Sequence, residues 1–219
     1  MTSARAIFCD FDGTITQSET FVDMLQTFAP EQASRIIPQI HDLSLSLHEG
    51  VTTMLQAIPS DRYEAAIAHA DPVQIRPGFA ELVEAARAHE VPFIVVSGGL
   101  YDMVVRKLGP LADRVTAVYA VHIDTSGPNL AVRSPFSDGK ELVAKVEVMR
   151  EHPARERVAI GDSTTDLQMS LVAERVFARR RLCDYLDERG KPYVRWQDFH
   201  DIHRHLSALW GWPEPPEAS

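Results

Sequence analysis

The sequence is poor in cysteine and has no long apolar run. It contains two cysteines, Cys9 and Cys183, in 219 residues, which is too few for the disulfide framework of a small secreted protein. No stretch approaches the ~18–20 consecutive apolar residues that a membrane-spanning helix needs. The N-terminal residues also lack the apolar core and small-residue cleavage site of a secretory signal. We therefore expect a cytoplasmic protein that does not contact a membrane.

Positive charge is scarce as well. The chain has 22 Lys and Arg residues against 31 Asp and Glu residues, a formal net charge of -9, and its densest basic run is Arg179-Arg180-Arg181. Proteins that bind nucleic acids use Lys and Arg to replace the counterions of the phosphate backbone. This composition therefore argues against a nucleic-acid partner. The oligomeric state is left open between a monomer and a homodimer.

Short apolar runs alternate with helical patterns over most of the chain, whose length suits one domain with a modest insertion. Apolar runs of strand length occur at 6–9, 92–96, 115–119, 157–160 and 175–178. Helical patterns occur at 79–89, 139–150, 164–171 and 182–188. This alternation predicts βαβ units and an α/β fold with a Rossmann-like parallel sheet. Two further runs around a Gly-Pro turn predict a hairpin, at 121–124 and 130–133.

One interval does not alternate. From Ser18 to about Ala70 the apolar residues fall at helical spacing, and prolines divide the segment into short pieces. Open α/β sheets bind ligands beyond the carboxyl ends of their strands, so helices inserted directly after the first strand would form a lid. We expect a catalytic core of residues 1–16 and 72–219 and a helical cap of residues 17–71 that determines substrate specificity.

Four acidic residues follow two of the predicted strands. Asp10 and Asp12 end the first strand, where an i, i+2 pair points to one side. Asp162 and Asp166 follow the run at 157–160. Either pair alone is also explained by a solvated turn or by an acid at a helix start. If the two strands are neighbours, however, all four acids converge on one hard cation, and oxygen ligands favour Mg²⁺.

Two further features suit a phosphate group. Ser97, Gly98 and Gly99 follow the run at 92–96, and a hydroxyl with exposed backbone amides before a helix can cradle an anion. A plain strand-to-helix turn is the alternative explanation of this tripeptide. Lys140 opens the predicted helix at 139–150, where a cation opposes the helix dipole. A solvated surface lysine is the alternative there.

Taken in order, these motifs resemble the haloacid dehalogenase-like hydrolase superfamily, and specifically its phosphatases with a helical cap after the first motif. The matching segments are Asp10-Phe11-Asp12-Gly13-Thr14, Ser97-Gly98-Gly99, Lys140 and Gly161-Asp162-Ser163-Thr164-Thr165-Asp166. The resemblance implies hydrolysis of phosphate monoesters on a Rossmann-like core, with Mg²⁺ as cofactor and a small phosphorylated metabolite as partner.

The resemblance assigns roles to the four acids. Asp10 would be the nucleophile that forms an aspartyl-phosphate. Asp12 would protonate the leaving alkoxide and then activate water as a base. The metal would be held by Asp10, the backbone carbonyl of Asp12 and Asp162. Asp166 would support it from the first or the second shell of ligands.

The same resemblance assigns the groups that bind substrate. Ser97 and the Gly98 amide would bind phosphate oxygens. Lys140 would be the third catalytic residue and would neutralise charge on the nucleophile and on the transferring group. Thr14 is counted with the substrate-binding residues, where it would order the loop rather than react. Glu19, at the start of the first cap helix, is the cap residue expected to face the site.

A narrower resemblance reaches into the cap. Segments 9–16, 27–30, 45–51, 177–179 and 197–199 resemble the methionine-salvage phosphatase family, which acts on 2-hydroxy-3-keto-5-methylthiopentenyl-1-phosphate. Phosphoserine phosphatases are the neighbouring alternative, because in them an acid near the position of Glu19 meets the substrate ammonium. Those enzymes also use a cap arginine for the substrate carboxylate, and residues 47–57 contain none. Thr165 also stands where they usually carry Asn. Both departures favour a less charged substrate.

A protein that binds or regulates without turnover is a third hypothesis on the same fold. The intact acids and Lys140 argue against it, because a non-catalytic descendant does not need all of them.

Overall fold

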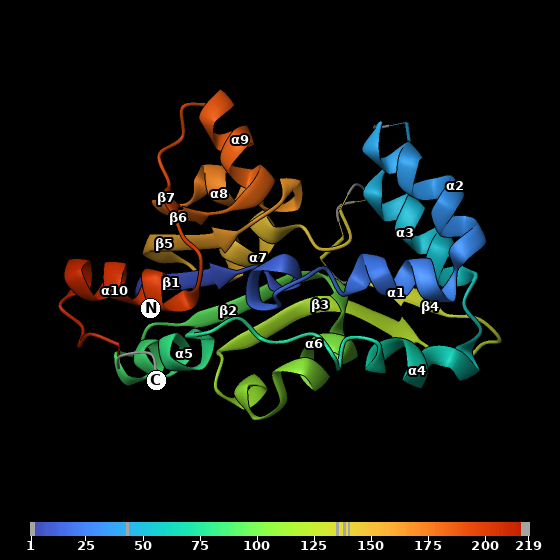
Figure 1. Ribbon diagram of the computed structural model, residues 1–219, viewed down its shortest axis with the longest axis horizontal. Coiled ribbons are helices and arrows are strands. Elements are labelled where there is room, and N and C mark those ends of the chain that lie inside the picture. Colours follow the sequence, from blue (N-terminus) through green and yellow to red (C-terminus); the bar gives the residue numbers. More distant parts are fainter. Residues whose placement is uncertain (1–2, 43, 135, 138, 140, 216–219) are drawn as a thin grey trace.

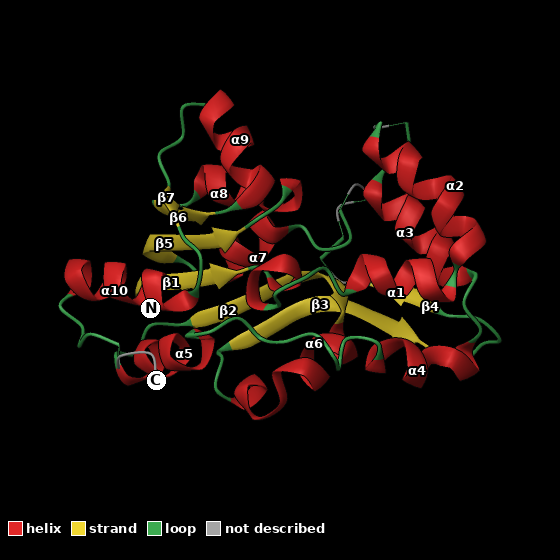
Figure 2. Cartoon of the chain, in the orientation of Figure 1, coloured by secondary structure: helices red, strands yellow, loops and turns green. Residues whose placement is uncertain are grey.

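The computed structural model describes residues 3–42, 44–134, 136–137, 139 and 141–215 (Figures 1 and 2). In these ranges the strands form a seven-stranded sheet in the order β4-β3-β2-β1-β5-β6-β7. All neighbouring strands are parallel except β3 and β4. The strands are β1 (Ser3–Cys9), β2 (Phe93–Leu100), β3 (Ala117–Asp124), β4 (Ala131–Arg133), β5 (Ala154–Gly161), β6 (Arg175–Ala178) and β7 (Val194–Arg195). The structure confirms the predicted α/β fold class.

Apolar residues on both faces explain why the central strands are buried. In β1, Ile7 and Cys9 join one apolar cluster, and Ala6 and Phe8 join another on the opposite face. Helices α5 (Phe79–Ala88) and α10 (Phe199–Trp210) contribute to the first cluster, and α7 (Lys145–Glu151), α8 (Leu167–Val172) and α9 (Arg180–Glu188) to the second. This two-sided covering matches the continuous apolar runs of the sequence, which are typical of parallel sheets.

The interval after β1 is helical, as the sequence predicts. Its described residues form α1 (Phe21–Phe28), α2 (Pro30–His41), α3 (Leu47–Gln56) and α4 (Tyr63–Ala68). Figure 1 shows these helices gathered at the end of the sheet toward which β1, β2 and β3 point. Their buried side chains belong to the same apolar cluster as one face of the sheet. The division into core and cap stays a prediction.

The chain enters the insertion near Thr16 and leaves it near Ile75, and hydrogen bonds join these two segments. Thr16 and Ile75 form an antiparallel bridge. The buried Arg76 guanidinium donates to the backbone carbonyls of Thr14 at 2.9 Å, Gly13 at 2.8 Å and Thr16 at 3.0 Å. The loop that follows β1 is therefore held by the residue at which the chain returns from the insertion.

The predicted hairpin is present and contacts the insertion. Its first strand is the second half of β3, which pairs with β4 from His122 opposite Arg133 to Asp124 opposite Ala131. In the hairpin loop, the Asn129 side-chain amide donates at 2.7 Å to the carbonyl of Gln56, the last residue of α3.

The helix expected at 139–150 begins later than the pattern suggests. Helix α7 starts at Lys145. Before it, the Ser137 hydroxyl donates to the Glu141 carbonyl at 3.0 Å, and the Ala144 amide donates to the Phe136 carbonyl at 2.9 Å. Side chains in this loop are buried like those on one face of a helix and therefore follow the same apolar pattern. The predicted helix consequently began too early. Strand β7 has two residues, too few to leave a pattern. Helix α6 (Tyr101–Leu108) follows β2 directly.

Candidate active site

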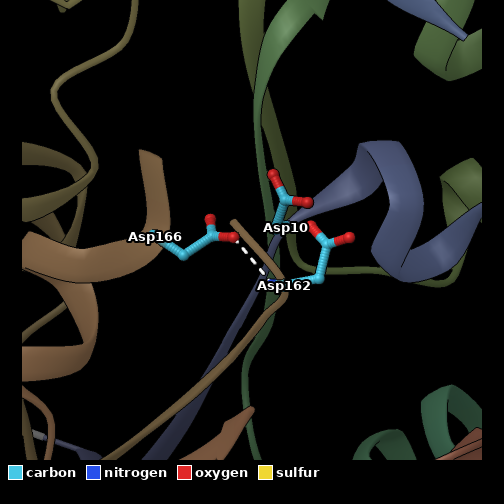
Figure 3. Close-up of side chains that lie close together, drawn as sticks. All are labelled: Asp10, Asp162 and Asp166. Carbon is cyan, nitrogen blue, oxygen red and sulfur yellow. Dashed lines mark hydrogen bonds between the residues drawn. The ribbon is translucent and has the colours of Figure 1, made fainter. Parts of the chain in front are cut away.

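The acids of the first and last motifs meet at the centre of the sheet. In the β1–β5 pair, Cys9 lies opposite Ile160, and the Asp10 amide donates to the Ile160 carbonyl at 2.9 Å. Asp10 and Asp162 therefore leave neighbouring strands at the same level. Carboxylate oxygens of Asp10, Asp162 and Asp166 lie within 4.8 Å of one another, and all three residues are at most 5% exposed. Figure 3 shows the three carboxylates facing one another.

A buried lysine, Lys145, lies beside these carboxylates, although it was not among the predicted site residues. Lys145 Nζ lies 2.5 Å from Asp10 Oδ1 and 2.6 Å from Asp166 Oδ1, and its side chain is 3% exposed. Burial by itself lowers the pKa of Lys145, but the two carboxylates raise it above its usual value, so the lysine is charged. Lys140 lies outside the described residues. In the sequence, Lys145 could have been noticed as the single lysine among the mostly apolar residues 142–149.

Asp166 orients its neighbours. Its Oδ2 accepts the backbone amides of Asp162 at 2.9 Å and Ser163 at 3.0 Å, while its Oδ1 accepts Lys145. A Cβ atom at Gly161 would lie 2.5 Å from the Asp166 Cγ. Only glycine at position 161 therefore allows this carboxylate to fold back onto the strand end.

The charges in this group suit a bound cation. Burial and the charge of Asp166 raise the pKa of Asp10, against the effect of Lys145. Burial and Asp166 likewise raise the pKa of Asp162 to about 6. Among the described residues, Asp162 Oδ1 is buried without a hydrogen-bond partner. The three carboxylates offer oxygen donors, one of them buried and without a partner among the described residues, and such donors suit a hard metal ion.

Asp12 takes a different position from the other acids. It lies in the turn at Phe11–Ile15 and is not part of the three-carboxylate group. Its Oδ1 accepts the Thr20 amide at 2.8 Å, the Thr20 hydroxyl and the Phe21 amide at 3.3 Å. Burial raises the pKa of Asp12, although these hydrogen bonds lower it. Asp12 therefore joins the strand end to the start of α1, and its backbone carbonyl as a metal ligand stays a prediction.

The expected phosphate cradle lies at the irregular end of β2. The strand register shifts between Val96 and Leu100. Ser97 is 1% exposed, and its hydroxyl accepts the Gly99 amide at 3.0 Å. Among the described residues, a Cβ atom at Gly98 would meet nothing within 4 Å, whereas one at Gly99 would lie 3.0 Å from Asp12 Oδ2. Gly98 thus borders open space, whereas Ser97 is buried and Gly99 lies beside Asp12, and an anion site formed by these residues stays a prediction.

Glu19 lies near the acidic group through Arg180, while its role in binding substrate stays a prediction. Its Oε1 lies 3.6 Å from Arg180 Nη1, and the same nitrogen donates to Asp162 Oδ2 at 3.2 Å. Burial, with the charges of Asp12 and Asp162, raises the pKa of Glu19 to about 7. Arg180 was visible in the sequence only as part of a basic run.

Thr14 is buried among these residues, but its hydroxyl has no hydrogen-bond partner in the described part of the chain. Its carbonyl accepts Arg76. This is consistent with an ordered loop, while a contact between Thr14 and substrate stays a prediction.

Comparison with known proteins points to the same family as the sequence motifs. A family model described as haloacid dehalogenase-like hydrolase matches residues 7–170. A 2-hydroxy-3-keto-5-methylthiopentenyl-1-phosphate phosphatase from Microcystis aeruginosa is 44% identical over 205 residues, covering 93% of this chain and 98% of the relative. A protein of the same name from Brevibacillus brevis is 32% identical over 217 residues, covering 95% and 98%. These matches confirm the resemblance drawn from the motifs.

Solved structures show the same fold at low identity. A phospho-aspartyl intermediate analogue of phosphoserine phosphatase has a TM-score of 0.67 and 19% identity, covering 94% of this chain and 99% of that one. A substrate-bound phosphoserine phosphatase has a TM-score of 0.68 and 18% identity. In the ranges that the structure describes, no helix is both long and apolar enough to span a membrane.

Proposed function

Because this chain belongs to the haloacid dehalogenase-like hydrolase family and is a phosphoric monoester hydrolase, we propose that it dephosphorylates 2-hydroxy-3-keto-5-methylthiopentenyl-1-phosphate in methionine salvage. We further propose that it depends on Mg²⁺ and forms an aspartyl-phosphate. The observation that carries the chemistry is the buried group of three carboxylates, two of which contact Lys145. The observation that favours the substrate is the identity to relatives of that name over nearly the whole chain.

Asp10 is the nucleophile in this proposal. Lys145 holds its Oδ1, so Oδ2 attacks phosphorus. A bond forms between Asp10 Oδ2 and phosphorus as the bond from phosphorus to the ester oxygen breaks. The charge of Lys145 stabilises the nucleophile and the transferring phosphoryl group. Lys145 thus takes the role that the sequence reading gave to Lys140.

Asp12 acts first as the general acid and then as the general base. Thr20 and Phe21 hold its Oδ1, and its Oδ2 lies toward Gly99. From Oδ2 the carboxyl donates a proton to the leaving alkoxide. The resulting carboxylate then takes a proton from the water that attacks phosphorus, which releases inorganic phosphate and restores Asp10.

Ser97 and Gly98 bind the phosphate oxygens. Both residues lie near the carboxyl end of β2, where a Cβ atom at Gly98 would meet no described residue within 4 Å. Their position fixes the phosphoryl group opposite Asp10 and excludes water from its equatorial oxygens. Positioning of this kind supplies a large part of the rate enhancement in phosphoryl transfer.

The residues present fit a Mg²⁺ ion. Asp162 Oδ1, a carboxylate oxygen of Asp10 and the backbone carbonyl of Asp12 would hold it, with Asp166 orienting them through its hydrogen bonds. A bound Mg²⁺ would offset negative charge on the phosphate and on the carboxylates. The donors are all oxygens, which this ion prefers.

The insertion of residues 17–71 is proposed as the cap that selects the leaving group. Its Glu19 already lies beside Arg180. A substrate ammonium would have to displace that guanidinium, which disfavours phosphoserine. Helix α3 carries no arginine that could bind a substrate carboxylate. Both features favour an uncharged leaving group.

The test compares substrates on the purified full-length protein with Mg²⁺. We expect kcat/KM to be highest for 2-hydroxy-3-keto-5-methylthiopentenyl-1-phosphate prepared in situ, lower for p-nitrophenyl phosphate and lowest for phosphoserine, with phosphate release lost in EDTA. A higher kcat/KM for phosphoserine would overturn the substrate. No Mg²⁺-dependent release from any of them would favour the non-catalytic alternative.

A matched pair of variants tests the nucleophile. Asp10→Asn removes the attacking oxygen and should lower kcat by about 10⁴-fold or more. Asp61→Asn makes the same change at an exposed position of the insertion and should leave kcat unchanged. Full activity of Asp10→Asn would refute the proposed role of Asp10 as the nucleophile.

A further inference from the structure

Arg180 joins two parts of the site that are far apart in the sequence. It is the first residue of α9, and its side chain is 47% exposed. The Nη1 atom donates to Asp162 Oδ2 at 3.2 Å and lies 3.6 Å from Glu19 Oε1. One nitrogen therefore contacts both the proposed metal site and the first residues of the proposed cap.

The two oxygens of Asp162 have separate surroundings. Oδ2 accepts the Arg180 guanidinium, whereas Oδ1 is buried without a partner among the described residues. A carboxylate that is fixed through one oxygen presents the other in a defined direction. Outer partners of this kind orient metal-binding carboxylates and tune their affinity.

The backbone of Arg180 has a strained conformation. Its φ is +50°, in the left-handed region that residues other than glycine rarely adopt. The segment is held against the end of β5, because the Arg179 amide donates to the Gly161 carbonyl at 3.3 Å and the Leu182 amide to the Asp162 carbonyl at 3.0 Å. Strain that the surrounding structure maintains is typical of functional positions.

The adjacent arginines behave differently. The Arg179 guanidinium lies 5.1 Å from the Trp196 ring centroid and donates to the Gln197 carbonyl at 3.1 Å. Arg181 is exposed. Of the three residues in this basic run, Arg180 alone contacts the acidic group in the described part of the structure.

We propose that Arg180 is a positioning residue that orients Asp162 for the metal and couples the metal site to the cap through Glu19. This inference rests on the metal site of the proposed function. Two consequences follow from it. Loss of the guanidinium weakens Mg²⁺ binding, because Asp162 loses its orientation. A change at Glu19 affects Mg²⁺ binding only while Arg180 is present.

Calorimetric titration of the metal-free full-length protein with Mg²⁺ alone tests the first consequence. Arg180→Met should weaken Mg²⁺ binding about 10-fold, Arg180→Lys should recover part of the loss, and the control Arg181→Met should stay within about twofold of wild type. Raising Mg²⁺ should restore the kcat of Arg180→Met on p-nitrophenyl phosphate. A merely structural role would not move the Mg²⁺ dependence.

Arg180→Gly keeps the test valid if the methionine variant folds poorly. Glycine accepts the left-handed backbone, so this variant should keep or raise the Tm measured in EDTA and still bind Mg²⁺ about 10-fold more weakly. Binding within twofold of wild type, or tighter than wild type, in a folded variant would overturn the positioning role. Absence of Mg²⁺ binding in the wild-type protein would instead refute the proposed metal site itself.

A double-mutant cycle tests the coupling to the cap. Glu19→Gln should weaken Mg²⁺ binding about two- to threefold in the wild-type background and have no further effect in Arg180→Met, because interacting residues are not additive. An equal effect of Glu19→Gln in both backgrounds would show that Glu19 acts without Arg180.

Discussion

Two charged groups lie side by side along the carboxyl edge of the sheet, and they differ in burial. The acidic group at the ends of β1 and β5 is at most 5% exposed and includes one lysine. The basic group beyond β6 and β7 borders a groove of about 730 Å³ and includes Arg180, Arg195 and Arg204, whose side chains are 47%, 69% and 53% exposed. Water solvates the exposed guanidiniums, whereas each buried carboxylate needs a partner inside the protein.

This difference explains why net charge says little about the site. The chain carries -9 overall, yet its proposed ligand is an anion. The buried acids are offset locally by Lys145 and would be offset further by a divalent cation. Changes in the buried group should therefore alter function strongly, and changes at exposed charges that do not contact this group weakly.

The largest effect is expected at Lys145. Lys145→Met leaves Asp10 and Asp166 without their shared cation and should lower kcat by about 10³-fold. Arg195→Met removes a charge from the basic group and should change kcat less than about twofold. Steady-state kinetics on p-nitrophenyl phosphate at saturating Mg²⁺ would measure both. A Lys145→Met enzyme with wild-type kcat would show that this buried contact is not part of the chemistry.

A smaller effect is expected at Gly13, where the two groups meet. Its φ is +73°, and a Cβ atom there would lie 2.5 Å from Asp162 Oδ2 and 3.0 Å from Arg180 Nη1. Gly13→Ala should lower kcat/KM by about 10²-fold, as expected when reacting groups are displaced by about 1 Å.

Gly190→Ala is the matched control for that change. Gly190 also has a positive φ, +60°, but no atom of the described ranges would lie within 4 Å of its Cβ. The positive φ alone should cost each variant about 1 kcal/mol of unfolding free energy in urea. Gly13→Ala should lose more because of the close contact, and only Gly13→Ala should lose activity. Equal kinetics in the two variants would contradict the close approach at Gly13.

The smallest effect is expected at an ion pair outside both groups. Hydrogen bonds from Arg157 lower the pKa of Glu174 to about 2. Because the folded pKa lies below the unfolded value, the stabilisation is present above about pH 4.5 and is lost as pH falls toward 2. Glu174 is 42% exposed, so Glu174→Gln should cost only about 0.5 kcal/mol at pH 7. Urea unfolding at pH 7 and pH 2 should show that difference disappear, with kcat unchanged.

Much of the fold follows from local patterns. Apolar runs of strand length predicted β1, β2, β3, β5 and β6, because strands buried on both faces need apolar side chains at every position. The late start of α7 did not follow, since buried loop residues carry the same pattern as a helix face. The two residues of β7 were too few to carry any pattern.

The sequence by itself determined that Asp10 and Asp162 follow two apolar strands, and parallel pairing of those strands then brings the carboxylates together. That outcome depends on strand geometry, which is local and periodic. Only the tertiary structure decided that Lys145 reaches Asp10 across 135 residues of chain and that Arg180 lies between Asp162 and Glu19. Long cationic side chains have many rotamers, and their partners are chosen by packing and burial rather than by neighbours in the sequence.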